Sequence, residues 1–254
     1  MRTILAGVLV ALLGGCGGGE SGSAPELSAA AVREAPDRVR AEGTFAFEAT
    51  YVRQVPDKPD ETYLTLTGAV DVRAGSGRMR ADLSALFAGV PESSAPFEEP
   101  IELSWTSEQL TAIVEGEPNS TPRARAREDG GLIGRMPDEP AALVELLGRA
   151  EEIRRLGDER VDGRPTIRFA CFVDSRRAGA AGVPIELAPA FAQALYGPRL
   201  PLEVWLDADG LPRRIEYLIR LKPVASGGKP ILPARAVRGT YDLSDFGADV
   251  APSR

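Results

Sequence analysis

The sequence predicts an α+β fold that consists mostly of antiparallel β-structure. Several segments alternate apolar and polar residues with a period of two, as strands do when one face is buried and the other meets water. Two segments favour helix, and turn sequences rich in Asp and Gly separate the strands. The chain has 254 residues, and β domains reach about this length as one unit. We therefore expect a single domain over residues 27–250.

The N-terminus has the features of a bacterial export signal. Arg2 precedes the apolar run Ile4–Leu13, which is shorter than the roughly 20 apolar residues that a membrane-spanning helix needs. The run ends in Leu13-Gly14-Gly15-Cys16, which resembles the bacterial lipobox. That resemblance implies removal of residues 1–15 as a signal peptide and lipidation of Cys16. The alternative is an ordinary secretory signal followed by a cysteine that coincidentally lies there.

A flexible tether follows the lipobox. Residues 16–26 begin with Cys16 and are rich in Gly and Ser, a composition that is typical of a flexible linker. Two or more acyl chains hold a protein stably at a bilayer, whereas one chain does so only marginally. We therefore expect the membrane as a partner through the lipidated Cys16, with the protein on the extracytoplasmic face of the cell membrane.

The domain is predicted to begin with a helix and two long strands. Residues 27–42 are rich in Ala, Arg and Glu, which favours helix, although Pro36 should kink or divide it. Strands are expected at residues 44–53 and 62–73, where apolar side chains occupy alternate positions. A turn then leads into a short extended segment at residues 78–83.

The middle of the chain is predicted to be less regular. Residues 85–100 are rich in Pro and acidic residues, and a hairpin is predicted at residues 101–105 and 109–115. The segment 116–140 is rich in Gly, Pro and charge, which indicates a long loop or a loop with a short helix. Residues 139–150 predict a helix, because three Leu and one Ala share a face at helical spacing.

The last third of the chain returns to strands. Their expected positions are residues 154–161, 166–173, 202–206, 211–221 and 234–243, with a short helix at 188–196. Asp207-Ala208-Asp209-Gly210 lies between two of these strands and predicts a hairpin turn. A calcium loop is the less favoured alternative there, because no Glu follows at the spacing that such a loop requires.

Composition excludes several classes of function. The chain has no His, so it lacks the commonest general base and the commonest metal ligand. Its 30 basic and 37 acidic residues give a formal net charge of -7, which repels polyanions such as nucleic acid. We therefore expect no enzyme activity, no catalytic residues, no metal, no cofactor and no nucleic-acid partner.

Three groups of polar or reactive residues have plain structural interpretations. Cys171 lies on the apolar side of an alternating segment, which predicts a buried thiol and not a reactive one. One basic group consists of Arg123, Arg125 and Arg127. A solvated loop is the favoured interpretation of this group, and contact with anionic headgroups is the alternative. Solvation is also favoured over paired catalytic carboxylates for Glu98, Glu99 and Glu102.

The arrangement of these features resembles the actinobacterial LppX/LprAFG lipoprotein family. The resemblance rests on the lipobox, the tether, the helix and two long strands, the middle helix and two blocks, GDERVDGRPT at residues 157–166 and LEVWLDADGLPRR at residues 202–214. It implies a LolA/LppX-like fold, in which a curved half-barrel sheet holds helices in its concave side. It also implies an apolar cavity that can hold acyl chains.

The resemblance and the strand pattern together lead to a functional expectation. The protein is expected to bind or transport an acylated lipid or glycolipid without catalysis. The alternation of the strands places eleven side chains toward the cavity: Phe45, Phe47, Leu64, Leu66, Val70, Ile167, Phe169, Val204, Ile215, Tyr217 and Ile219.

An alternative function uses the same fold with a filled core. The protein would then be a tethered sensor or protein-interaction lipoprotein that contacts a partner through the outside of the sheet. Small inward residues do not decide between the two, because they either leave room for lipid or permit the sheet to curve. These residues are Ala49, Gly68, Ala112 and Gly239.

Overall fold

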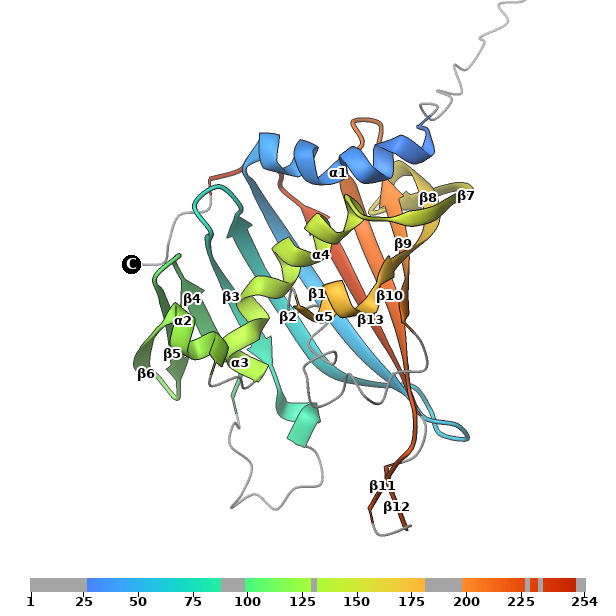
Figure 1. The fold of residues 1–254 in the computed structure, drawn as a ribbon. Helices are drawn as coiled ribbons and strands as arrows, with labels where there is room; N and C mark the ends of the chain where they lie inside the picture. The colour runs from blue at the N-terminus through green and yellow to red at the C-terminus, as the bar shows by residue number, and fades with distance from the viewer. Residues whose placement is uncertain are drawn as a thin grey trace, which may run out of the picture.

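A single large antiparallel sheet dominates the computed structural model (Figure 1). The structure describes residues 27–87, 99–128, 132–180, 198–226, 229–232 and 235–249. The predicted signal peptide and tether, with Cys16, and the predicted helix at 188–196 lie outside these residues. The sheet has 11 strands in the order β6-β5-β4-β3-β2-β1-β13-β10-β9-β8-β7, and every neighbouring pair is antiparallel.

The strands agree closely with the predicted segments. In chain order the large sheet contains β1 (Thr44–Gln54), β2 (Glu61–Asp71), β3 (Ser76–Asp82), β4 (Ile101–Trp105), β5 (Gln109–Val114), β6 (Glu117–Pro122), β7 (Glu151–Val161), β8 (Arg164–Asp174), β9 (Arg199–Leu206), β10 (Pro212–Leu221) and β13 (Arg235–Ser244). A separate small hairpin, which the sequence did not predict, consists of β11 (Val224–Ser226) and β12 (Lys229–Leu232).

The helices lie on one side of the curled sheet. Helix α1 (Ala29–Glu42) crosses one end of the strands, and α4 (Glu139–Leu147) runs across the concave side (Figure 1). The shorter elements are η1 (Ser84–Phe87), α2 (Arg123–Glu128), α3 (Leu132–Arg135), η3 (Met136–Asp138) and α5 (Ser175–Ala180). This curved half-barrel with helices in its hollow confirms the predicted fold class. None of the helices in the described ranges is long and apolar enough to cross a membrane.

The inner and outer faces of the sheet follow directly from strand alternation. In β1, Phe45, Phe47, Ala49 and Tyr51 are buried, whereas the residues between them are more exposed. The buried side chains of all the long strands except β7 join those of α1 and α4 in one hydrophobic cluster. Because each strand places alternate residues on opposite faces, this cluster lies on the concave side.

Helix α1 is not divided at Pro36. We expected Pro36 to kink or divide the helix, and the helix runs continuously from Ala29 to Glu42 with Pro36 inside it. A proline in a helix loses one main-chain hydrogen bond. The ring of Pro36 is buried and lies close to Gly148, which caps the C-terminus of α4. Burial of the ring against α4 offsets the lost hydrogen bond.

The segment 116–140 is also more regular than predicted. It contains β6, which pairs with β5, followed by α2, α3 and η3. Strand β6 has the sequence EPNSTP and no apolar residue to alternate, so its strand character comes only from pairing at the edge of the sheet. The long loop that we expected here was therefore wrong, although the short helices within it agree with the alternative.

Candidate functional site

The eleven side chains predicted to line a cavity all lie on the concave face. They come from β1, β2, β8, β9 and β10, and each has at most 2% of its surface exposed. The register brings them into rows: Ile215 pairs with Val204, and Val204 pairs with Phe169 across three strands. The structure thus gathers the set on one apolar surface and covers it. Whether this surface opens into a lipid cavity stays a prediction.

Two of the small inward residues permit close packing and do not leave space. A Cβ atom on Gly239 would lie 2.2 Å from Cζ of Tyr217, so the tyrosine ring fills the place above this glycine. A Cβ atom on Gly68 would lie 2.3 Å from the carbonyl oxygen of Arg78. Glycine at these positions therefore lets a ring or a neighbouring strand approach the backbone.

A polar cluster lies within the apolar interior, and the sequence analysis did not predict it. Glu139, the first residue of α4, is fully buried, and the hydroxyl of Tyr217 donates to its Oε1 atom at 3.2 Å. The hydroxyls of Tyr51 and Tyr241 form a hydrogen bond to each other nearby, and the Tyr51 ring packs edge-on against those of Tyr217 and Tyr241. Buried polar groups need such partners, so this cluster is a place where a polar group is held inside the core.

Arg123, the first residue of the basic group, is buried and does not lie in a solvated loop. Arg123 begins α2, has 3% of its surface exposed and forms a 2.7 Å ion pair with Asp138. Its guanidinium also lies over the ring of Trp105, with Cζ 5.8 Å from the centroid. Burial lowers the pKa of Arg123, and Asp138 opposes that shift. Since Arg127 binds the same carboxylate, the two arginines fix α2 to the start of α4.

The turn at Asp207 and the burial of Cys171 agree with the predictions. Asp207 accepts backbone N–H bonds from Asp209 and Leu211, each at 3.0 Å, and binds Arg213, which confirms a turn. Cys171 is buried, and burial raises the pKa of its thiol to about 12. Glu102 is exposed, and Glu98 lies outside the described residues. Across the residues that the structure does describe, no cluster of three or more Cys, Asp or Glu side chains could hold a metal ion.

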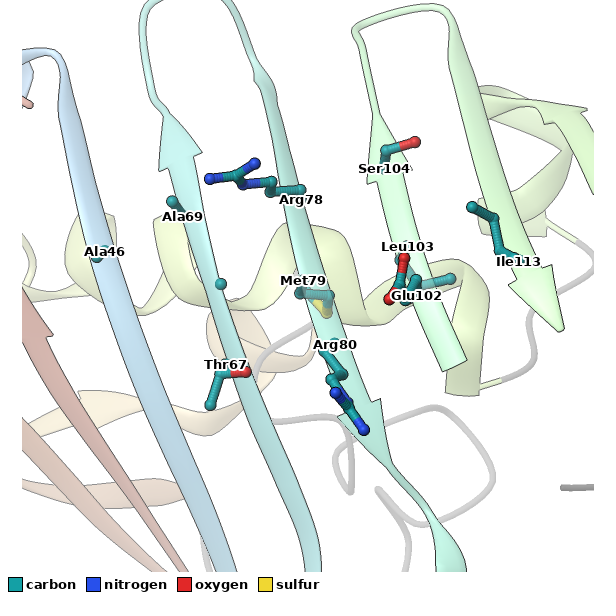
Figure 2. A pocket seen from close by; sticks show the side chains of 11 residues that line it. Ala46, Thr67, Ala69, Arg78, Met79, Arg80, Glu102, Leu103, Ser104 and Ile113 are labelled. Atoms are coloured by element: carbon teal, nitrogen blue, oxygen red, sulfur yellow. The ribbon is translucent and has the colours of Figure 1, made fainter. Parts of the chain in front are cut away.

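The convex face of the sheet carries a second candidate site, which the sequence did not predict. A hollow of about 440 Å³ lies over β1 to β5 (Figure 2). The figure shows the strands from outside, with Arg78 extending toward Ala69 and Arg80 extending away from it along β3. The lining consists of Ala46, Thr67, Gly68, Ala69, Arg78, Met79, Arg80, Glu102, Leu103, Ser104 and Ile113. Cross-strand register decides which of these meet, and a single sequence does not show that register.

Comparisons with known proteins identify the fold. No protein-family model and no curated protein sequence matches the chain. The structure is similar to that of lipoprotein LppX from Mycobacterium tuberculosis, with a TM-score of 0.52, 10% identity and coverage of 88% of this chain and 97% of LppX. It is also similar to LprF from Mycobacterium bovis, with a TM-score of 0.50, 18% identity and coverage of 91% and 98%.

These similarities are similarities of fold. Identities of 10% and 18% do not carry residue roles from one chain to another.

Proposed function

The chain has the LppX/LprF-like fold, and we propose that it is a membrane-anchored, extracytoplasmic lipoprotein that binds an acylated lipid or glycolipid and has no enzyme activity. The observation that carries the proposal is the continuous apolar surface on the concave face, which extends from β2 through β1 and β10 to β8. A surface of this kind, covered by helices, matches the acyl chains of a lipid in polarity. The fold similarity supports the same function.

The mechanism is transfer between two apolar environments. An acyl chain that leaves a bilayer for this interior keeps its surface away from water, so net affinity comes from packing and from contacts to the headgroup. The eleven concave side chains are covered in this structure. Uptake therefore requires the covering elements to move, which is a shift toward a more open state that lipid binding would stabilise.

In this proposal, the N-terminal segment determines where the protein is located. Residues 1–15 act as a signal peptide, Cys16 carries the lipid, residues 16–26 act as the tether and residues 27–250 form the binding domain. Replacement of Cys16 by Ser should move the protein from the membrane fraction to the soluble fraction of the cells. A Cys16→Ser variant that stays in the membrane fraction would remove lipid anchoring from the proposal.

Lipid mass spectrometry of the full chain, purified from membranes, tests the binding function. We expect a co-purifying acyl lipid, and we expect Ala49→Leu to reduce its amount because Ala49 is buried on the concave face. Ala170→Leu is the matched control, since Ala170 alternates with the buried Phe169 and Cys171 and points to the convex side. Protein that contains no lipid and also ignores added fluorescent fatty acid would contradict the proposal.

A second candidate function is supported by the burial itself. Since none of the eleven side chains exposes more than 2% of its surface, the concave side has the packing of a filled core. The protein would then be a tethered sensor or protein-interaction module. Cross-linking in cells that captures one defined protein, together with the absence of bound lipid, would favour this candidate over lipid binding.

A further inference from the structure

The convex hollow has a defined pattern of side chains, because the register of four strand pairs fixes their neighbours. In one row, Ala46 pairs with Ala69, Ala69 with Arg78, and Arg78 with Ser104. In the next row, Thr67 pairs with Arg80, Arg80 with Glu102, and Glu102 with Ile113. The first row therefore contains one long cationic side chain among three small ones. Two alanines next to Arg78 leave the space that forms the hollow.

Among the described residues, no acid forms an ion pair with Arg78. Its cross-strand neighbours are Ala69 and Ser104, and within the described ranges neither Arg78 nor Arg80 forms an ion pair within 4.0 Å. Arg80 is nearer to acids, because Glu102 lies directly opposite it and Asp82 lies two residues further along the same strand. Arg78 is therefore the stronger candidate to bind an external anion. The two arginines and Glu102 leave a net positive charge in the lining.

We propose that this convex hollow binds a phosphate group that carries a hydroxylated substituent, of which glycerol phosphate is the simplest example. The guanidinium of Arg78 would hold the phosphate, since its planar set of N–H donors matches phosphate oxygens. Thr67 offers a hydroxyl on β2, the strand toward which Arg78 extends. Ser104 and Glu102 lie on β4, across β3, where Ser104 offers a second hydroxyl and Glu102 can accept a hydrogen bond from a ligand hydroxyl. The volume of about 440 Å³ lies within the range of small-molecule sites.

The same chemistry occurs in a free phosphate ester and in the headgroup of a glycerophospholipid. The site lies on the face of the sheet opposite the apolar interior, so it is independent of the proposed acyl-lipid function. Alternation separates them: Ala81 is buried on the concave side and does not line the hollow, whereas Arg78 and Arg80 are exposed on the convex side. A ligand in the hollow would contact none of the eleven concave side chains.

Calorimetry with glycerol 3-phosphate on the full chain tests the proposal. We expect saturable binding that Arg78→Gln weakens at least about tenfold, because a charge-assisted hydrogen bond is lost. Arg220→Gln is the matched control, since Arg220 is exposed on the outward side of β10 and does not line the hollow. We expect Arg220→Gln to leave binding unchanged. Equal weakening by both variants would overturn the proposal, because it would show only general attraction to positive charge.

A second variant separates the shape of the hollow from its charge. Ala69→Leu keeps both arginines but fills the space beside Arg78, so we expect it to abolish glycerol 3-phosphate binding while circular dichroism stays unchanged. Retained binding in this variant, or no binding by the wild-type protein at millimolar ligand, would overturn the proposal. Soluble dihexanoyl phosphatidylglycerol identifies the source: binding that depends on Arg78 indicates that headgroups are accepted, and binding of glycerol 3-phosphate alone indicates a free phosphate ester.

Discussion

The two halves of the convex face differ in how their charges are balanced. Over β7 to β10 and β13, arginines pair with acids on neighbouring strands: Arg168 with Glu159 and Glu203, Arg214 with Asp242, and Arg238 with Glu216. Over β1 to β5, Arg78 and Arg80 make no such pair among the described residues, and alanines leave a hollow beside them. Both halves are the outer face of one sheet, so cross-strand neighbours and side-chain size produce the difference.

Trp205 covers part of the convex face over β7 to β10 and β13. It lies on the convex side yet is only 5% exposed. Its indole N–H donates to Glu159 at 2.8 Å, and Arg168 lies over its ring with Cζ 5.0 Å from the centroid. The large ring and the paired ions thus cover this part of the sheet. A solvated sheet face keeps an open hollow where small residues lie beside an arginine that has no ion pair among the described residues.

The largest expected effect is the loss of Trp205. Trp205→Ala removes the ring beneath Arg168 and leaves Glu159 without its indole donor. We expect the free energy of unfolding to fall by about 3 kcal/mol, measured by urea denaturation. Ile113→Ala is the control in the other half, where Ile113 is only partly buried at the rim of the hollow, and it should cost less than half as much. Equal losses would show that the two halves are equally well packed.

The next largest effect concerns Gly68 beneath the hollow. Gly68→Ala places a Cβ atom 2.3 Å from the carbonyl oxygen of Arg78, so β2 and β3 must separate. We expect a loss of about 2 kcal/mol, typical of overpacking, in the same denaturation assay. Thr67→Ala on the adjacent exposed position should change stability by no more than about 0.5 kcal/mol. A Gly68→Ala variant as stable as Thr67→Ala would mean that the close approach of β3 is unnecessary.

A smaller effect separates paired from unpaired arginines. Arg168→Gln removes contacts to Glu159 and Glu203, and we expect it to lower the free energy of unfolding by about 1 kcal/mol at low salt. Arg78→Gln removes no ion pair in the described part of the chain and should be neutral for stability. The assay is denaturation at low and high salt. If Arg78→Gln proves as destabilising as Arg168→Gln, Arg78 has a structural role and the contrast fails.

The smallest expected effect is on carboxyl titration within the paired half. Hydrogen bonds from Trp205 and Arg168 lower the pKa of Glu159, whereas burial raises the pKa of Glu216. Carbon-detected NMR should show Glu159 titrating below, and Glu216 above, the ordinary glutamate value of about 4.3. Equal titration midpoints for the two residues, or a higher midpoint for Glu159 than for Glu216, would contradict the assigned contacts.

These shifts have opposite consequences for stability. The stability that Glu159 contributes is complete above the unfolded-state pKa and is lost as the pH falls through the lowered folded-state pKa. The contribution of Glu216 is complete below the unfolded-state pKa and is lost as the pH rises through the raised folded-state pKa. Glu159→Gln should therefore reduce the fall in the free energy of unfolding as the pH is lowered, whereas Glu216→Gln should not.

Local pattern was enough to predict most of the sheet. The alternation in β1 and in β8, including Cys171, correctly placed the buried side chains, because period-two burial is a local property of a strand. The turn at Asp207 was also predictable, since its side chain satisfies its own turn. The edge strand β6 was missed, because its polar sequence becomes a strand only through its partner.

The features that depend on distant residues could not be predicted. Glu139 is polar and begins a helix, which alone suggests an exposed position, yet Tyr217 from β10 meets it in the interior. Arg123 is buried because Asp138 and Trp105 come together around it. The convex hollow depends on register across several strands. Each requires knowledge of which strands and helices are neighbours.

The position of β1 in the middle of the sheet also affects how the molecule is made. Its two partners are β2, which follows at once, and β13, whose Ser244 pairs with Ala46. A ribosome therefore releases β1 long before its second partner exists, and pairing across so long a stretch of chain is slow. One edge of β1 therefore has no partner in this sheet until β13 has been made.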